Sequence, residues 1–329
     1  QLHAHLHGCI RPETLADLAR ARAITMSAEQ LEVLAPGAGR SLSDCFKIFD
    51  LIHSVVTDLA AVRRITTEAL QDMSQDNVRY AELRTTPRPL PDGTTRETYI
   101  KTVLQQLRIF EKENSRATEE DSDEASTVKR ALLIPRLLLS VDRSRGVDEA
   151  MKVVELALSL KEHDEWGDYI LGMDFSGNPT KGLFQDFRPA FDTARRGGLK
   201  IAVHCGETLN DADTTAVIDF RPERLGHAIV LGEEVRCRLL SEEPRIPIEI
   251  CPTSNRLTLA FDNHGEHPTV GCWIENRYPF SVNTDDPGVF DTDLSAEYAH
   301  IAGSHGMDKS KMANLACRAV QVGVRFTSV

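Results

Sequence analysis

The stretch LKIAVHCGE, residues 199–207, is an apolar run that ends in two residues suited to chemistry, His204 and Glu207. Other runs of this kind occur along the chain, and polar residues end or follow nearly all of them. Such runs, bounded by polar and turn-forming residues, predict β-strands. The predicted strands are residues 2–6, 78–85, 131–141, 169–175, 199–205, 224–226, 246–251 and 279–282.

Helical patterns separate most of these strands. They cover residues 12–22, 42–56, 58–76, 95–113, 146–164, 184–197, 232–242 and 292–303, and a last one begins near residue 308. Alternation of strand and helix indicates a parallel sheet, and eight repeats predict a closed (β/α)₈ barrel, the TIM-barrel fold of the α/β class. We therefore expect residues 1–329 to form a single barrel domain, with its active site at the carboxyl ends of the strands.

Two segments depart from eight plain repeats. Three helical patterns lie between the first two strands, so extra helices must sit near the end of the first strand. Among them, residues 42–56 are amphipathic, and the segment is either a lid or a helix packed on the barrel wall. Residues 114–128 are acidic and rich in Ser and Thr without an apolar period, which predicts a disordered surface insertion.

Composition excludes several classes of function. With 38 Lys+Arg against 50 Asp+Glu, the net charge is −12, so we expect no nucleic-acid or anionic-membrane partner. No apolar run approaches the roughly 20 residues that span a bilayer, and the first residues do not resemble a secretion signal. These features predict a cytoplasmic protein, and we expect it to be a monomer. Because the sequence begins without Met and directly in a strand, we expect it to be part of a slightly longer product.

The cysteines carry little signal. There are 7, an odd number, and no C-x-x-C occurs. This argues against a disulfide framework and against a zinc ribbon. We expect reduced thiols in the core.

A candidate metal site follows from the ends of three strands. His3 and His5 are two apart on a strand, so both point to one face, which is the interior of a barrel. His204 ends the fifth strand and Asp285 follows the eighth, at the same mouth. Three His and one Asp leave a position for water, as in catalytic zinc sites. We therefore expect one Zn²⁺ per chain.

Two further residues at this mouth can handle protons, Glu207 and His227. Each has a plainer explanation: Glu207 as a carboxylate that complements a helix N-terminus, and His227 as a satisfied loop histidine. Asp286, likewise, has an alternative role as an N-cap. The location of all these residues at carboxyl strand ends favours a shared site.

The motifs HAHLHG (3–8), HCGE (204–207), LGHA (225–228) and NTDD (283–286), in this order, resemble those of the adenosine deaminase family of zinc-dependent amidohydrolase barrels. The resemblance implies that His3, His5, His204 and Asp285 bind zinc. It implies that Glu207 protonates purine N1 and that His227 acts as a base and as an electrostatic partner to the attacking water. Asp286 is expected to accept a hydrogen bond at N7, and the backbone near Gly177 to meet N3.

Four other segments resemble the members of the family that act on N6-methyl-AMP more than the nucleoside enzymes. They are YAELRTTPR (80–88), LLSVDRSRG (138–146), LGMDFSGNPT (171–180) and ICPTSN (250–255). The implied reaction is hydrolysis at C6 of a purine nucleotide, releasing methylamine and IMP. The alternatives that remain are deamination of adenosine, and a catalytically silent barrel that binds purines.

A phosphate site distinguishes a nucleotide from a nucleoside. Arg88 is the candidate, because its planar fork matches phosphate oxygens, although a solvated loop charge is the plainer explanation. The expected substrate contacts are His5, His7, His53, Thr85, Thr86, Pro87, Arg88, Asp142, Gly177 and Asp286. At position 7 the nucleotide-acting relatives usually have Asn and the nucleoside enzymes Asp, so the absence of a carboxylate favours a nucleotide. Phe46, Phe49 and Leu51 are candidates to surround the N6 substituent.

Other enzyme classes fit less well. A binuclear amidohydrolase generally needs a bridging Lys or Glu on the fourth strand, and YILGMDFSG (169–177) contains neither. The P-C-x-x-C motif of the cytidine-type zinc deaminases is absent. Also absent are H-E-x-x-H, G-x-S-x-G and a Walker loop, which excludes the metalloprotease, α/β-hydrolase and P-loop classes.

Overall fold

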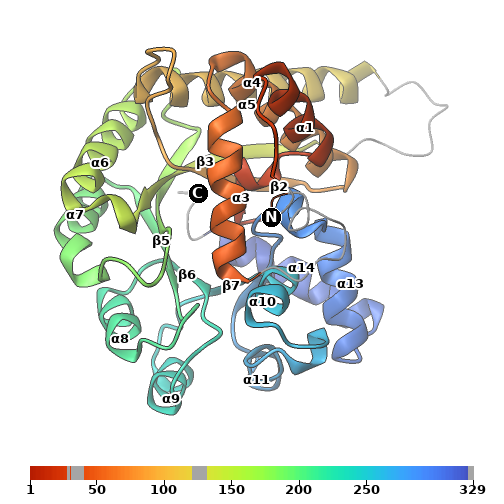
Figure 1. Ribbon diagram of the computed structural model, residues 1–329. Coiled ribbons are helices and arrows are strands. Elements are labelled where there is room, and N and C mark those ends of the chain that lie inside the picture. The colour runs from red at the N-terminus through yellow and green to blue at the C-terminus, as the bar shows by residue number, and fades with distance from the viewer. Residues whose placement is uncertain (28–29, 31–40, 121–131, 325–329) are drawn as a thin grey trace.

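A computed structural model describes residues 1–27, 30, 41–120 and 132–324 of the chain (Figure 1). In this part the strands form one parallel sheet whose spatial order is the order of the sequence. Each strand overlaps one of the predicted runs, so the sequence pattern located all of them. The strands are β1 Ala4–His5, β2 Tyr80–Thr85, β3 Ile134–Asp142, β4 Ile170–Ser176, β5 Lys200–Cys205, β6 Arg224–His227, β7 Ile248–Ile250 and β8 Phe280–Val282.

The sheet closes into a barrel through Asp285, which lies shortly after the end of β8. The His5 amide donates to the Asp285 carbonyl at 2.9 Å, and the Asp285 amide donates to the His3 carbonyl at 3.0 Å. Ala4 and Asp285 thereby form a parallel bridge between the first strand and the end of the last. The predicted (β/α)₈ barrel is confirmed.

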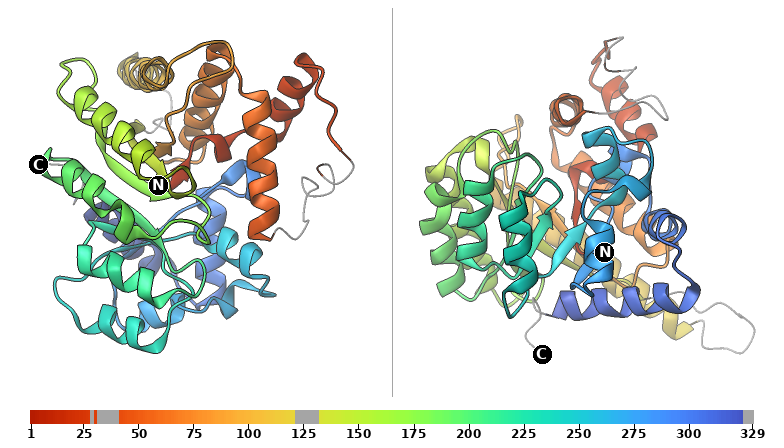
Figure 2. Two further views of the ribbon diagram at one scale, coloured as in Figure 1. Left: turned by 60° about the vertical axis from the view of Figure 1, so that its left-hand side comes forward. Right: turned by 90° about the horizontal axis from the view of Figure 1, so that it is seen from below.

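Helices surround the strands. They are α1 Pro12–Ala21, α3 Leu42–Val55, α4 Leu59–Gln75, α5 Arg96–Glu120, α6 Val147–Lys161, α7 Phe184–Arg196, α8 Asp211–Phe220, α9 Glu233–Ser241, α10 Pro252–Leu259, α11 Val270–Glu275, α12 Pro287–Phe290, α13 Leu294–Ser304 and α14 Lys309–Val324. Three short 3₁₀ turns complete them: η1 His7–Cys9, η2 Arg143–Arg145 and η3 His264–Glu266. Figure 2 shows α6, α7 and α8, in green, packed side by side along the outside of the barrel.

The sequence pattern missed α8, α10, α11 and α12. The last three are short, with eight, six and four residues, too few to show a helical period. Helix α8 is longer, but its buried face mixes Asp213 and Thr214 with Val217 and Ile218, so no apolar stripe marks it. Its start is nevertheless encoded, because the Asn210 side chain accepts from the Asp213 amide as an N-cap.

The segment predicted to be disordered begins inside a helix. Helix α5 continues to Glu120, so residues 114–120 are helical and the prediction is wrong for them. The stretch contains Glu, Arg and Ala, which are good helix formers. Residues 121–128 lie outside the described part of the chain.

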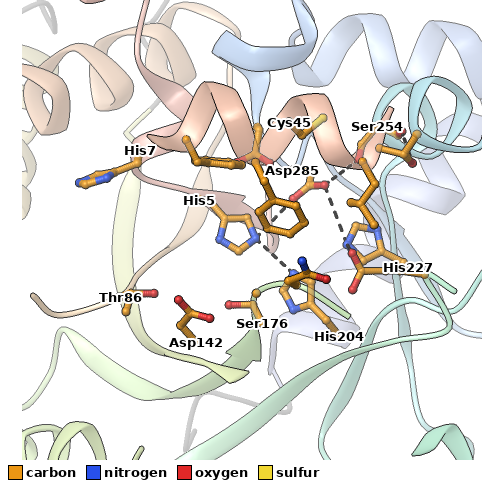
Figure 3. Close-up of a pocket in the computed structure, with 18 of the residues that line it drawn as sticks. His5, His7, Cys45, Thr86, Asp142, Ser176, His204, His227, Ser254 and Asp285 are labelled. Atoms are coloured by element: carbon orange, nitrogen blue, oxygen red, sulfur yellow. Dashed lines mark hydrogen bonds and ion pairs between the residues drawn. The ribbon is translucent and has the colours of Figure 1, made fainter. Parts of the chain in front are cut away.

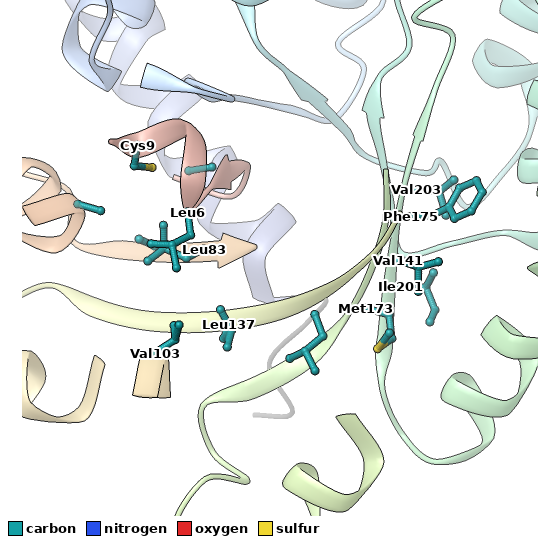
Figure 4. Close-up of a cluster of buried hydrophobic side chains, with 14 of the residues drawn as sticks. Leu6, Cys9, Leu83, Val103, Leu137, Val141, Met173, Phe175, Ile201 and Val203 are labelled. Atoms are coloured by element: carbon teal, nitrogen blue, oxygen red, sulfur yellow. The ribbon is translucent and has the colours of Figure 1, made fainter. Parts of the chain in front are cut away.

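The strands carry two different faces. Apolar residues at alternating positions point outward to the helices, and they form the core in Figure 4, which includes Leu83, Leu137, Met173, Phe175 and Val203. The intervening positions point into the barrel, and many are charged: Glu82, Arg84, Asp174, Arg224 and Glu249, all without exposed surface. The interior of this barrel is therefore an ionic layer, where branched apolar residues are usual.

Helix α3 lies across the front of the strands in Figure 1. Ser41 caps it through a capping box with Asp44, which defines where it begins. The seven cysteines, all among the described residues, form no disulfide. Cys9, Cys45, Cys205 and Cys251 are buried, as expected, whereas Cys237 and Cys317 are exposed, so the expectation of core thiols is wrong for them. In the described residues, no helix combines the length and the apolar character needed to cross a membrane.

Candidate functional site

A cavity of about 580 Å³ opens at the carboxyl ends of the strands, where the barrel fold predicts the active site. Figure 3 shows side chains from strands around the barrel and from α3 pointing into it. Most of the predicted site residues line this cavity. They are His5, His7, His53, Thr85, Thr86, Asp142, Gly177, His204, Glu207, His227, Asp285 and Asp286.

At the floor of the cavity, His3, His204, His227 and Asp285 each offer one ligand atom within 4.8 Å of the others. His5 belongs to the same group, because its Nε2 lies 3.2 Å from Nε2 of His204 and 3.4 Å from Oδ1 of Asp285. His3 Nε2 is 3.2 Å from that same carboxylate oxygen. The structure brings together all four residues expected to bind zinc and adds His227.

These distances fit a metal ion. Ligands about 2.0–2.1 Å from a tetrahedral zinc ion lie roughly 3.3 Å from one another, and the three contacts above measure 3.2–3.4 Å. His3 Nε2 is buried and has no hydrogen-bond partner. A buried nitrogen without a partner is costly unless it has another ligand, so the donor set is suited to a cation.

A second layer of residues orients the imidazoles. His3 Nδ1 is 2.7 Å from Oε2 of Glu249, and His204 Nδ1 is 3.0 Å from Oδ1 of Asp174. Each contact occupies Nδ1 and leaves Nε2 facing the centre of the site, as is usual for metal-binding histidines. The Ser254 hydroxyl donates to Asp285 Oδ2 at 2.7 Å, which directs Oδ1 inward.

Two buried arginines hold these carboxylates in place. Arg84 donates to Asp174 and to Glu249, both at 2.8 Å. Arg224 donates to Glu249 at 2.5 Å and also contacts Glu82. The sequence analysis missed this network. The sequence nevertheless contains an indication of it, because charged residues alternate with apolar residues in strands whose other positions are typical of a buried core.

Electrostatics set the protonation states. Burial alone would raise the pKa of Asp285, but the close contact with His3 and the other neighbouring imidazoles hold it well below its usual range. Burial lowers the pKa of His5 and of His204, so both rings are neutral. Metal ligands must be deprotonated carboxylates and neutral imidazoles, and Asp285, His5 and His204 favour these forms. Burial lowers the pKa of His3, but its contacts with Asp285 and Glu249 outweigh burial and raise that pKa.

Glu207 is suited to the opposite role. Burial raises the pKa of Glu207, and its Oε2 has no hydrogen-bond partner in the described protein. A buried carboxyl group with a raised pKa is suited to act as a general acid. His227 lies beside it, with Nε2 at 4.0 Å from Glu207 Oε1 and 3.9 Å from Asp285 Oδ2.

His227 and Asp285 adopt strained backbone conformations, with φ of 62° and 61°. Non-glycine residues rarely occupy this left-handed region, and they persist there only where the surroundings enforce it. The strain turns both side chains toward the cavity at the point where their strands end.

Asp286 is buried beside Gly8. A Cβ atom at Gly8 would lie 1.8 Å from Asp286 Oδ1, so only glycine leaves room for this carboxyl group. Burial, followed by the charge of Asp285, raises the pKa of Asp286 well above its usual range. Its Oδ1 is buried without a partner, so a protonated Asp286 has an unused hydrogen-bonding group in the cavity.

The predicted phosphate contacts divide into two groups. Thr85, Thr86, His7 and His53 line the cavity, and a chain of hydrogen bonds links Thr85 through Tyr99 to His7. Pro87 and Arg88 are not among the lining residues; the Arg88 guanidinium instead donates to the Val56 carbonyl at 2.7 Å. Peptide geometry after the strand directs it into the protein.

Two cations that the sequence analysis did not single out line the cavity in its place. Arg145 is the last residue of η2, and its Nε donates to Asp142 at 3.1 Å. Lys181 comes from the loop after β4. Both could have been found from the sequence as basic residues in the segments that follow β3 and β4, at the carboxyl ends of the strands.

Helix α3 serves both of the roles considered for it. Phe46, Phe49 and His53 line the cavity, so one face of the helix covers the site. Leu51 and Ile52 are buried in the core, so the opposite face packs on the protein. Leu51 therefore does not line the pocket, contrary to expectation, whereas Phe46 and Phe49 do line it.

Comparison with known families matches residues 1–325 to the model described as adenosine deaminase. The chain belongs to the adenosine deaminase family. The members of this family are aminohydrolases, and the His/His/His/Asp group described above is the kind of metal-binding arrangement that such an enzyme uses.

Among curated members, the chain is similar to the N6-mAMP deaminase of Arabidopsis thaliana, with 38% identity over 97% of this chain and 90% of that protein. It is 32% identical to the N6-methyl-AMP deaminase of Homo sapiens, covering 97% and 86%. Among solved structures, the Arabidopsis protein described as complexed with IMP has a TM-score of 0.84 and 37% identity, covering 98% of this chain and 90% of the other.

Proposed function

We propose that this chain catalyses hydrolytic deamination at C6 of N6-methyl-AMP and related N6-substituted AMP, forming IMP and methylamine. The observation that carries the proposal is the meeting of imidazole nitrogens and one carboxylate oxygen at 3.2–3.4 Å, beside the buried acid Glu207. Similarity to deaminases of N6-methyl-AMP supports the substrate.

We propose His3, His5, His204 and Asp285 as the ligands of a single Zn²⁺ ion. The short contacts among these residues support this set, whereas His227 Nε2 is farther away, at 3.9 Å from the nearer Asp285 oxygen. When bound in such a site, zinc supplies a water whose pKa is lowered to about 7.

The surrounding residues then direct the reaction. Glu207 donates its proton to purine N1, which makes C6 more electrophilic. The water oxygen forms a bond to C6, the bond from C6 to the exocyclic nitrogen breaks, and the amine leaves with a proton. Water is consumed, and the ring becomes a 6-oxopurine.

Asp286 and Gly177 orient the purine. Purine N7 offers only a lone pair, so Asp286 must donate a hydrogen bond to it. This reverses the direction expected from the sequence, and the raised pKa of Asp286 supports the protonated form. Gly177 has φ of +98°, and a Cβ there would lie 2.4 Å from Asp142 Oδ1, so the backbone can approach the N3 edge closely.

The nucleotide phosphate is proposed to bind at the mouth, near Thr85, Thr86, His7 and His53. Burial lowers the pKa of His53 to about 4, and that of His7 well below its usual value, so both contribute hydrogen bonds rather than charge. Arg145 and Lys181 supply the positive charge that a phosphate needs in a protein with a net charge of −12.

We propose that Phe46 and Phe49 contact the N6 substituent, since they give α3 an apolar face over the site. One methyl group in such a pocket contributes about 1–3 kcal/mol to discrimination. We further propose that a monomer is the active unit. We also propose a cytoplasmic location, in keeping with free thiols and the absence of a spanning helix in the described residues.

The test is to incubate the zinc-loaded protein with adenosine, AMP and N6-methyl-AMP in parallel and to follow the purine absorbance. We expect turnover of N6-methyl-AMP without turnover of adenosine, and a loss on the order of 10²–10⁴-fold in Glu207→Gln. Arg145→Met should raise KM for the nucleotide, with Arg20→Met on the exposed face of α1 as the control. Turnover of adenosine alone refutes the phosphate site, and no turnover at all refutes the enzymatic proposal.

A further inference from the structure

A line of hydrogen bonds reaches His227 from outside the active site, beginning at the start of α11. The backbone amides of Thr269 and Val270 point at His267 Nδ1, at 3.4 and 3.3 Å. A backbone N–H can only donate, so Nδ1 must be the acceptor. Burial lowers the pKa of His267 to about 3, so the ring is neutral and its single proton is on Nε2.

This proton fixes the orientation of the next side chain. His267 Nε2 is 3.1 Å from Asn255 Oδ1, so the imidazole donates and the amide oxygen accepts. The amide nitrogen of Asn255 must then face the other way, and it lies 3.0 Å from His227 Nδ1. All three side chains are buried, so water does not compete for these bonds.

The last bond determines which nitrogen of His227 carries a proton. The amide nitrogen of Asn255 has no lone pair to offer, so His227 Nδ1 must accept. An imidazole with a bare Nδ1 is neutral and carries its proton on Nε2. The surroundings of Nε2 agree, because its neighbours are Asp285 Oδ2 at 3.9 Å and Glu207 Oε1 at 4.0 Å. A bare Nε2 would direct its lone pair at the deprotonated Asp285 carboxylate.

We propose that His267 and Asn255 are positioning residues that hold His227 as the Nε2–H tautomer. In this form His227 donates a hydrogen bond to the oxygen that attacks C6 and does not take that water's proton. The proton passes instead to Glu207, whose carboxylate can accept it once Glu207 has protonated purine N1. This inference rests on the proposed function, and it replaces the role of base that the family resemblance implied for His227.

The test is ¹⁵N NMR of the zinc-loaded protein labelled at histidine, with His227→Gln used to identify the His227 signals. We expect the wild-type His227 ring to be protonated on Nε2 and bare on Nδ1. In Asn255→Asp, a carboxylate of the same shape can only accept, so Nδ1 should become protonated. The same variant should lose on the order of 10²-fold in kcat while KM changes little, because general acid–base geometry contributes at least that much.

Two substitutions at His267 separate polarity from packing. His267→Gln keeps an N–H donor toward Asn255 and should keep the wild-type tautomer of His227. His267→Glu offers only acceptors, so the Asn255 amide should turn over and His227 should gain a proton on Nδ1.

A wild-type ring protonated on Nδ1 overturns the proposal, and so does an unchanged tautomer in both Asn255→Asp and His267→Glu. The NMR signals need no substrate. If N6-methyl-AMP is not turned over but the tautomers behave as stated, the proposed function fails and the positioning of His227 stands.

Discussion

Replacing Arg84 by Met tests whether the ionic layer inside the barrel holds the metal site together. Arg84 has no exposed surface, and it donates to Asp174, to Glu249 and to the Leu2 carbonyl. Met fills similar space without charge, so the substitution leaves two buried carboxylates without their shared partner. Breaking a buried ion pair from one side costs about 3–5 kcal/mol.

A loss of this size is a large part of the roughly 5–15 kcal/mol that stabilises most proteins. A second effect should follow at the metal site, because Asp174 and Glu249 orient His204 and His3. Loss of such supporting contacts lowers metal affinity by about 10–100-fold. Arg84→Met should therefore be destabilised without metal and should also bind zinc more weakly.

The two effects require separate assays. Urea denaturation in the presence of a chelator measures the free energy of unfolding of the metal-free protein, and a competition titration measures zinc affinity. Arg20→Met is the matched control, because Arg20 pairs with Asp17 in an exposed contact and should change stability by less than about 0.5 kcal/mol. If metal-free Arg84→Met lost less than about 1 kcal/mol of unfolding free energy, the reasoning would be refuted. The buried ion pair would then contribute no more to stability than an exposed one.

Two further predictions concern buried carboxyl groups. Burial raises the pKa of Glu297 from its ordinary 4.5 to about 7, so the folded protein holds a proton that the unfolded chain releases, and stability present below pH 4.5 is lost as pH rises to 7. Glu297→Gln should remove roughly 3 kcal/mol of this pH dependence, measured by urea denaturation from pH 5 to pH 8; a wild-type profile flat over that range contradicts the assignment. Gly8→Ala, whose Cβ would lie 1.8 Å from Asp286 Oδ1, should displace that carboxyl group and reduce kcat/KM on the order of 10-fold, about the contribution of one hydrogen bond. Unchanged kinetics in Gly8→Ala would show that Asp286 does not contact the purine.

The fold was predictable because each strand is a short apolar run with polar residues at its end. That same rule located His204, Glu207 and Asp285, since a parallel barrel brings all carboxyl strand ends to one mouth. Arg88 shows where the rule fails. Sequence order shows that Arg88 follows β2, but it does not show the direction of its side chain. In the structure this side chain donates a hydrogen bond to the Val56 carbonyl.

The roles of other site residues could not be predicted because of the short elements on which they lie. Asn255 and Ser254 lie on a helix of eight residues that has no readable period. His267 follows a short 3₁₀ turn and reaches the site only through Asn255. Such contacts depend on how loops fold back over the barrel, which spacing along the chain does not encode.

The closure of the barrel has a consequence for how the protein matures. His3 and His5 lie on the first strand, and Asp285 lies beyond the last, with two backbone hydrogen bonds joining the two edges. A nascent chain therefore lacks the carboxylate of the metal site until the segment that follows β8 has been synthesised and β8 has docked. We therefore expect the metal ion to bind late in folding. Once bound, the ion links the first strand to the residues after the last strand, which two backbone hydrogen bonds otherwise join.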